Sequence, residues 1–373
     1  MTIEDLRESF EDFSSGIPEH RVDRNKLHSI SEILFLTLTA IICGCEGWRD
    51  IERFGRAKIE VLRRVFPFKY GIPSGDTLRR FFRSLNPVIF QTCFVEWVKT
   101  LKLPSSLHVA IDGKISRHSF DGENNPLHIV SAFSSEYRLV LAQEKVSDKS
   151  NEITAIPKLL SLLDLQGAVI TIDAMGCQRE IAEQIAQKEA DYVFSLKGNQ
   201  GRLNQDVTLM FQDADVIKSL KCELYETVDG SEHGCLEERQ YRVIQCPDSI
   251  QEHHNWPHLK TLIEVPSMRE IKGDRTQEKR YYISSLELDA KKIGDLIRAH
   301  WSVENSLHWV LDISFRDDDS RIRRGNAPQN IAVIKHMALN LLQKTKGKRD
   351  SIKQLRKAAG WDNDLLFNIL QKI

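Results

Sequence analysis

Two apolar segments of the sequence each lead into an aspartate. Residues 107–111 precede Asp112 and residues 168–172 precede Asp173, and a small residue follows each acid. A carboxylate at the end of a buried strand is poorly solvated, so its ionised form needs a compensating cation or hydrogen-bond donors. Oxygen ligands favour Mg²⁺ or Mn²⁺ over Zn²⁺, and those ions assist phosphodiester transfer. The pair of aspartates therefore predicts a hard-cation site.

A later helical segment offers a third acid. Glu304 has His300 and His308 one turn away on either side, and Asp312 and residues 317–319 are competing acids that spacing alone does not exclude. Two imidazoles and a carboxylate at this spacing could instead share Zn²⁺, although the His-Glu-x-x-His order of zinc hydrolases is absent. In the simplest alternative, both histidines form hydrogen bonds within a packed helix.

Basic residues near these acids fit a polyanionic partner. Lysine and arginine contribute affinity through phosphates without reading base sequence. Lys197 is the strongest candidate because it follows an apolar strand, at the edge where the aspartates emerge. Each of these residues, taken alone, also fits ordinary surface charge. The other predicted DNA contacts are Lys114, Arg117, Arg298, Arg321, Arg323 and Arg324, with His300 and His308 as further candidates.

The amino-terminal part of the chain is locally basic. Residues 49–83 hold ten basic and four acidic side chains, an excess of six, whereas the whole chain has a net charge of −1. Residues 70–75 break the helical pattern, and Asp76 or Thr77 could cap a new helix that carries Arg79, Arg80 and Arg83. This pattern predicts a DNA-binding helix-turn-helix; solvated arginines on a helical bundle are the alternative.

The elements that must position these residues fall into two groups. Residues 1–95 are predicted to be helical, with a capping-box pattern at 29–32 that opens an apolar helix. Five strands follow, with crossover helices at 152–165 and 178–188 between the last three. The order β-β-β-α-β-α-β predicts the mixed sheet of a ribonuclease-H-like α/β fold. The strands are expected at residues 107–111, 127–133, 138–146, 168–172 and 192–196.

A β-rich insertion is expected at about residues 221–287, between a helical stretch that begins at 201 and a helix from 290 to about 310. Its turns, at 229–231 and 272–274, are polar and would lie at the surface. Another long helix is expected at 328–344. The predicted domains are a helical, DNA-binding domain at 1–95 and a catalytic domain at 96–373. The four expected strands of the insertion are 223–228, 238–244, 260–265 and 279–284.

Composition predicts a soluble, folded protein, with 41% hydrophobic and 28% charged residues. The longest apolar stretch, residues 33–45, is too short to span a membrane as a helix. The first ten residues do not resemble a secretion signal, and the seven cysteines form no Cys-x-x-Cys pair, which predicts reduced thiols and a cytoplasmic location.

Several motifs together resemble the H-repeat-associated insertion-sequence transposases, over nearly the whole chain. The resemblance implies a helical amino-terminal domain, a ribonuclease-H-like catalytic domain with a β-rich insertion, and a DDE triad of Asp112, Asp173 and Glu304. It thereby selects Glu304 over the neighbouring acids. The motifs lie at residues 71–74, 110–114, 149–152, 171–174, 196–200, 300–305 through Asp312, and 324–330.

One departure limits this resemblance. Related cut-and-paste transposases often carry a Tyr, an Arg and a Lys at fixed positions around the glutamate, and here those positions hold Ile297, His300 and Leu311. The DNA contacts of that pattern therefore do not carry over, and Arg298, His300 and His308 are the candidates to replace them.

The sequence thus predicts a DNA transposase dependent on Mg²⁺ or Mn²⁺. It would hydrolyse a phosphodiester at an element end and direct the freed 3′-hydroxyl at target DNA, with two metal ions on the three carboxylates. The expected partners are double-stranded DNA at the element ends and target, with a homodimer as one arrangement of the DNA complex, at the nucleoid and away from membranes. The alternatives are a domesticated DNA nuclease of the same fold and a catalytically inactive DNA-binding protein.

Overall fold

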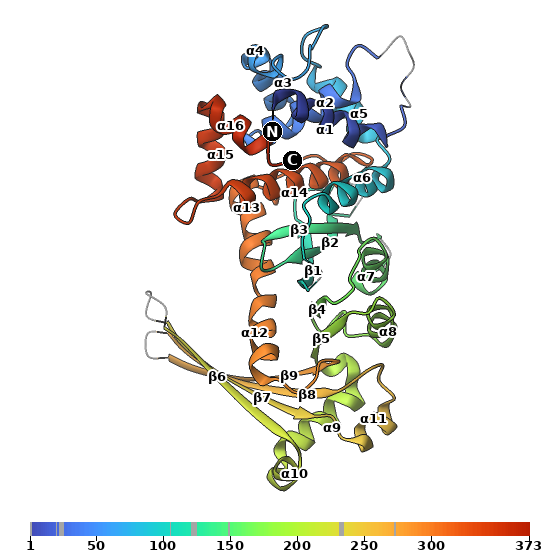
Figure 1. Cartoon of the computed structure of the whole chain (residues 1–373), viewed down its shortest axis with the longest axis vertical. Helices are drawn as coiled ribbons and strands as arrows, with labels where there is room; N and C mark the ends of the chain where they lie inside the picture. Colours follow the sequence, from blue (N-terminus) through green and yellow to red (C-terminus); the bar gives the residue numbers. More distant parts are fainter. Residues whose placement is uncertain are drawn as a thin grey trace.

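The computed structural model describes residues 2–19, 21, 26–104, 106–120, 125–147, 150–230, 235–271 and 274–373. The molecule is elongated: the first and last helices lie together at one end, the sheet is in the middle, and long hairpins form the other end (Figure 1). Residue 149 of the motif at 149–152, and residues 231 and 272–273 of the two predicted turns, lie outside the described residues.

The amino-terminal part is helical, as predicted, and its described residues contain no strand before His108. The Ser29 hydroxyl accepts from the Glu32 backbone N–H, and the Glu32 carboxylate accepts from the Ser29 backbone N–H, so the predicted capping box is confirmed. The helices are α1 (Ile3–Ser15), α2 (Ile30–Ile42), α3 (Trp48–Ala57), α4 (Ile59–Leu62), α5 (Gly75–Ser84) and α6 (Pro87–Lys99).

The helix with the three arginines, α5, is present, but two details of its prediction were wrong. Its cap is Ser74, whose hydroxyl accepts from the Thr77 backbone N–H, and neither Asp76 nor Thr77 takes that role. Residues 63–74 separate α4 from α5, which is longer than the three- or four-residue turn of a helix-turn-helix. DNA binding by this region remains a prediction.

The predicted ribonuclease-H-like α/β fold is confirmed by a mixed sheet flanked by helices. β1 pairs antiparallel with β2 and parallel with β4; β2 pairs antiparallel with β3, and β4 pairs parallel with β5. The elements are β1 (His108–Ser116), β2 (Leu127–Ser134), β3 (Leu139–Lys145), α7 (Glu152–Ser161), β4 (Val169–Ile172), α8 (Arg179–Gln187) and β5 (Asp191–Leu196).

β1 is longer than predicted. Residues 112–116 pair with residues 127–131 of β2, so Asp112 lies within the strand and not at its end. β4, in contrast, stops at Ile172, which pairs with Ile111, and Asp173 follows directly. From Asp112 onward, the side of β1 that faced β4 therefore has no strand partner, and Asp173 lies beside this opening.

The strands of the β-rich insertion extend this same sheet. β9 pairs antiparallel with β5, giving the nine-stranded order β3-β2-β1-β4-β5-β9-β8-β7-β6. These strands are longer than predicted. Their outer ends are polar and partly exposed, and they lack the apolar alternation on which the prediction relied. They are β6 (Cys222–Gly230), β7 (Cys235–Gln245), β8 (Thr261–Ile271) and β9 (Asp274–Ser284), accompanied by η2 (Gly198–Gln200), α9 (Gly201–Gln212), α10 (Ala214–Ser219) and α11 (Asp248–His254).

The last helices return to the amino-terminal end. α14 buries 14 of its 19 residues and packs against α2, α5, α6 and β3. Asn340 of α14 accepts from the Val140 N–H and donates to the Val140 carbonyl, at 2.8 Å each, which pairs backbone groups of the edge strand β3. These elements are α12 (Ala290–His300), the π-helical η3 (Glu304–His308), α13 (Trp309–Phe315), α14 (Ala327–Thr345), α15 (Ile352–Trp361) and α16 (Asn363–Leu370).

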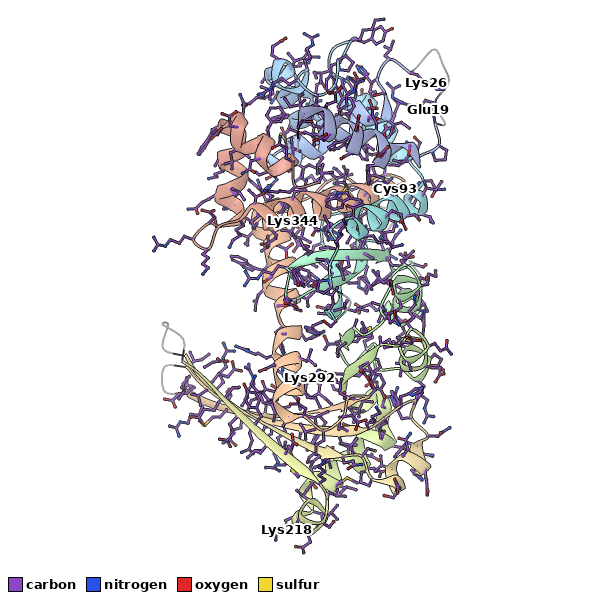
Figure 2. All side chains as sticks on the ribbon, viewed as in Figure 1. Glu19, Lys26, Cys93, Lys218, Lys292 and Lys344 are labelled. Atoms are coloured by element: carbon purple, nitrogen blue, oxygen red, sulfur yellow. The ribbon has the colours of Figure 1, made fainter. Side chains whose placement is uncertain are left out.

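One hydrophobic core joins these helices to the sheet, from Leu6 in α1 to Leu370 in α16. Figure 2 marks Cys93 on α6 and Lys344 on α14 at this end of the molecule, and Lys218 on α10 at the opposite end. The division at about residue 95 stays a prediction. Within the described ranges, no helix is long and apolar enough to cross a membrane.

Candidate active site

The three predicted acids line one cavity of about 410 Å³. Asp112 comes from β1, Asp173 from the residue after β4, and Glu304 from the start of η3. Lys197, directly after β5, lines the same cavity. Four separate elements thus bring three carboxylates and one ammonium group together beside the open side of β1.

Asp112 is largely withdrawn from solvent, with 26% of its side chain exposed. Burial raises the pKa of its carboxyl to about 7, and the negative charges of Glu152, Asp173 and Glu304 act in the same direction. A hydrogen bond from the Gly113 backbone opposes this rise. Without a cation, this carboxylate is therefore costly to ionise.

Asp173 is held by the turn that follows β4. Its Oδ1 accepts from the backbone N–H groups of Met175 and Gly176, at 3.0 and 3.2 Å. Burial raises the pKa of its carboxyl, the charge of Glu152 raises it further, and the charge of Lys197 lowers it. The two backbone donors fix one oxygen and leave the other available to a ligand.

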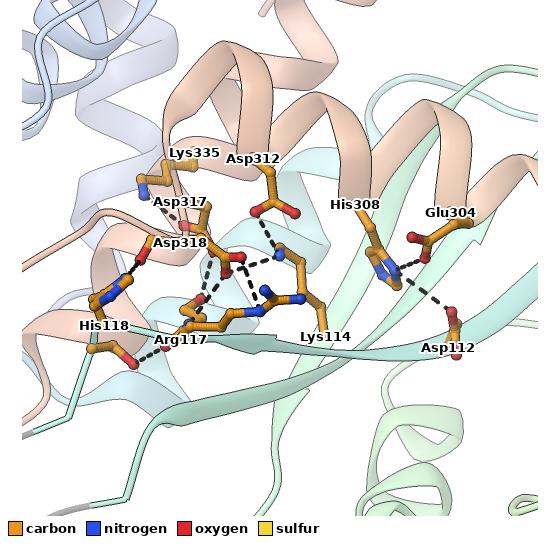
Figure 3. Close-up of polar contacts among 12 residues, drawn as sticks. Asp112, Lys114, Arg117, His118, Glu304, His308, Asp312, Asp317, Asp318 and Lys335 are labelled. Carbon is orange, nitrogen blue, oxygen red and sulfur yellow. Dashed lines mark hydrogen bonds and ion pairs between the residues drawn. The ribbon is translucent and has the colours of Figure 1, made fainter.

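Glu304 begins a π-helical turn that interrupts the helix predicted over residues 290–310. The Trp309 N–H donates to the Glu304 carbonyl, and the wider turn places Glu304 and His308 together over β1 (Figure 3). His308 Nδ1 lies 3.0 Å from Glu304 Oε2 and 3.6 Å from Asp112 Oδ2. Such single π-helical turns occur frequently at functional sites.

One ligand atom each from Asp112, Glu304 and His308 lies within 4.8 Å of the other two, so this group could hold a metal ion. Burial lowers the pKa of His308, which is 5% exposed, and its Nε2 has no hydrogen-bond partner among the described residues. A neutral imidazole can serve as a metal ligand, and it offsets little of the negative charge of the two carboxylates beside it.

His300 has a different environment. Its Nδ1 lies 2.8 Å from the Thr171 hydroxyl, which in turn lies 2.8 Å from His108 Nε2. Burial lowers the pKa of His300 to about 4 and that of His108 to about 3. His300 therefore holds the helix against β4 as a neutral side chain. It is not in the group with Glu304 and His308, which leaves the zinc alternative without its third ligand.

Three of the acids that competed with Glu304, Asp312, Asp317 and Asp318, belong to a separate charge cluster (Figure 3), and the fourth, Asp319, pairs with Arg316. Asp312 Oδ1 lies 2.6 Å from Lys114 Nζ, and Asp318 lies 3.5 Å from the same nitrogen. Asp317 is buried, and its carboxylate accepts hydrogen bonds from the Ser116 hydroxyl and the Lys335 ammonium group. Lys114 has only 12% of its side chain exposed, so these ion pairs, and not a phosphate, occupy it here.

The other predicted DNA contacts do not line this cavity. Arg298 pairs with Asp229 at 2.9 Å, and Arg117 Nε lies 3.3 Å from Asp318. Arg321 and Arg324 are exposed, whereas Arg323 donates to the His118 carbonyl.

The loop that carries these last arginines packs against α5. A Cβ at Gly325 would lie 2.6 Å from Arg83 Cγ, and the Asn326 N–H donates to the Arg83 carbonyl. The predicted arginines of α5 are tied to the helix itself, since Arg79 pairs with Asp76 and Arg80 donates to the Asp76 carbonyl. Two basic segments far apart in the sequence are thus neighbours in space.

Two cavity residues were not foreseen from the sequence. The Arg280 guanidinium of β9 lies over the Trp301 ring, 4.9 Å from its centroid, and both residues line the cavity with the acids. Trp301 is 43% exposed, which leaves part of its ring open to a ligand. Arg280 carried no local signal, because only the β5–β9 pairing brings β9 to this site, whereas Trp301 lies next to His300 in the motif that contains Glu304.

Comparison with known families shows what the chain is related to. Residues 103–341 match the family model described as "Transposase DDE domain", and residues 11–98 match one described as "DDE_Tnp_1-associated". The first match alone covers more than half of the chain. The chain belongs to the DDE transposase family. A transposase of this family acts on DNA, and the DDE domain is metal-dependent.

Two relatives of this DDE transposase span nearly its whole length. "H repeat-associated putative transposase YhhI" of Escherichia coli (strain K12) is 40% identical over 366 residues, 95% of this chain and 96% of the relative. "Putative transposase YncI" of Escherichia coli O157:H7 is 43% identical over 370 residues, 97% of this chain and 94% of the relative. A shorter relative, "Inactive transposase YbfQ" of strain K12, is 43% identical over 63 residues, 17% of this chain and 75% of its own.

Proposed function

We propose that this DDE transposase is an active, metal-dependent enzyme that cuts a phosphodiester at an element end and then joins the freed 3′-hydroxyl to target DNA. Asp112, Asp173 and Glu304 would hold Mg²⁺ or Mn²⁺. The observation that carries the proposal is the convergence of these three acids, from three separate elements, on one cavity.

The residues present fit a hard divalent cation. Their donors are carboxylate oxygens, with one imidazole at the edge, and such donors suit Mg²⁺ and Mn²⁺. Burial raises the pKa of both Asp112 and Asp173, as expected for carboxylates that await a cation. When bound, the metal lowers the pKa of the attacking water or hydroxyl and stabilises the charge on the leaving oxygen.

The protein side chains supply position and charge around that reaction. Lys197 offers an ammonium group where a DNA phosphate could enter the cavity, and Arg280, on the strand that pairs with β5, adds a guanidinium beside it. The backbone donors to Asp173 and the His308 contact with Glu304 hold both carboxylates in place before DNA arrives. The exposed Arg321 and Arg324 would extend the DNA contact toward α5.

Cleavage of a labelled duplex that carries the flanking inverted repeats, with Mg²⁺ or Mn²⁺, tests the proposal. The variants are Asp112→Asn, Asp173→Asn and Glu304→Gln, and Glu287→Gln, whose side chain is 84% exposed, is the matched control. We expect the wild type and the control to cut and to join ends, and each site variant to lose at least about a hundredfold in rate. Folding of each variant is checked by circular dichroism.

Three other outcomes are informative. Cutting without strand transfer would identify a domesticated nuclease. DNA binding without cutting by either metal would identify an inactive DNA-binding protein, an outcome made relevant by the relative named as inactive. Undiminished cutting by folded Asp173→Asn protein would refute the proposed triad.

A further inference from the structure

A fourth carboxylate lies at the same opening of β1. Glu152 is the first residue of α7, and 12% of its side chain is exposed. Its Oε1 lies 2.9 Å from His128 Nε2, on β2. The side chain therefore points from the start of the crossover helix toward the sheet, where the neighbouring imidazole holds it.

Gly113 shows how close this carboxylate comes to the catalytic strand. A Cβ at Gly113 would lie 2.1 Å from Glu152 Oε1 and 2.8 Å from His128 Nε2. The Glu152 carboxylate thus occupies the space that a side chain at position 113 would take, next in sequence to Asp112. Any residue other than glycine here would push this carboxylate away.

Glu152 reaches β1 from the opposite side to Glu304. Successive side chains of a strand point to opposite faces, so the Gly113 position faces away from the side of Asp112. α7 lies on one side of the sheet and α12, which leads into Glu304, lies on the other (Figure 1). Because β4 ends at Ile172, no strand closes the gap between the two faces at this point.

Glu152 adds a further carboxylate where Asp112 and Asp173 already meet. Its Oε1 lies against Gly113, the residue after Asp112, and Asp173 follows the end of β4 at the same opening. Three buried or half-buried carboxylates at one opening repel one another unless a cation lies among them.

We propose that Glu152 is a fourth carboxylate ligand of the metal centre. His128 orients it, and Gly113 leaves room for it because it has no side chain. This inference rests on the proposed function of the triad. Mg²⁺ and Mn²⁺ take about six oxygen ligands, so a fourth carboxylate leaves positions for water and a phosphate. A hydrogen bond from a neighbouring imidazole fixes a ligating carboxylate and contributes to metal affinity.

Mn²⁺ binding to the full-length, metal-free protein tests this inference without reference to activity. Calorimetric titration compares wild type with Glu152→Gln, Asp112→Asn and Asp173→Asn. The control is Glu180→Gln, an exposed glutamate in the first turn of the neighbouring helix α8. We expect Glu152→Gln to weaken Mn²⁺ affinity about tenfold or more, as the two aspartate variants do, and the control to bind like the wild type.

The outcomes separate the two proposals. Wild-type affinity in folded Glu152→Gln protein, with affinity lost in both aspartate variants, overturns the role of Glu152 and leaves the triad intact. A wild type that binds no Mn²⁺ overturns the metal centre as a whole. Should Glu152→Gln fail to fold, Gly113→Ala carries the test, because its methyl group displaces the Glu152 carboxylate: weakened affinity supports the inference, and wild-type affinity overturns it.

Discussion

Replacing Asp112 by asparagine should stabilise the metal-free protein, and the gain should depend on pH. Burial raises the pKa of this carboxyl from its ordinary value of 3.8 to about 7 in the folded protein. Asparagine has nearly the same shape and no charge, so it removes the cost of a buried carboxylate without opening a cavity.

The sign and size of the effect follow from proton linkage. Because the folded pKa is the higher one, the contribution of Asp112 to stability is full below about pH 4 and is lost as the pH rises through 7. The gap between 3.8 and about 7 corresponds to about 4 kcal/mol, an upper figure because the side chain is 26% exposed. Asp112→Asn should therefore exceed wild type by about 2 to 4 kcal/mol above pH 7, and by little at pH 4.

Urea denaturation of both proteins in EDTA, at several pH values between 4.5 and 8.5, measures the difference. Asp215→Asn, whose side chain is 95% exposed, is the control and should change stability little at any pH. Saturating Mg²⁺ should then stabilise wild type and leave Asp112→Asn nearly unchanged. A variant no more stable than wild type at pH 8, or a gain that does not vary with pH, would refute this account of the buried carboxylate.

Two further predictions concern side chains around the cavity. Thr171→Val removes the hydroxyl between His300 and His108 and leaves both buried imidazoles without that partner. The free energy of unfolding, measured by urea denaturation, should therefore fall by about 1 to 3 kcal/mol, and a loss under about 0.5 kcal/mol would contradict the reasoning. Lys197→Ala should weaken DNA binding about equally for all sequences and reduce the salt dependence of affinity by about one phosphate contact. Fluorescence anisotropy at several salt concentrations measures both effects, and an unchanged salt dependence would exclude a direct phosphate contact.

The sequence predicted those features that depend on local pattern. The apolar runs before Asp112 and Asp173 mark strands because burial and alternation act over a few residues, and the capping box at Ser29 is a contact within one turn. The ends of elements were less certain: β1 continues past Asp112 because β2 supplies a partner, which no local pattern reveals. α5 is capped by Ser74, two residues before Asp76, so the helix begins earlier than predicted.

Two of the residues that were missed depend on long-range packing. Arg280 reaches the cavity only because β9 joins β5, and Glu152 lies against Gly113 because α7 starts there. Conversely, Lys114 has the right position in the sequence for a phosphate contact, yet Asp312 and Asp318 engage it. Proximity in sequence to a catalytic acid therefore does not decide which cations face the substrate.

The position of α14 has a consequence for how the protein is made. α2 buries its apolar surface against a helix that begins at Ala327, roughly 230 residues after α6 ends at Lys99. At about 5–20 residues per second, the ribosome needs roughly 10 to 45 seconds to supply that helix. During this interval the nascent amino-terminal helices expose apolar surface, which favours aggregation. A gene copy interrupted before α14 would lose the packing partner of the amino-terminal helices together with the carboxy-terminal helices.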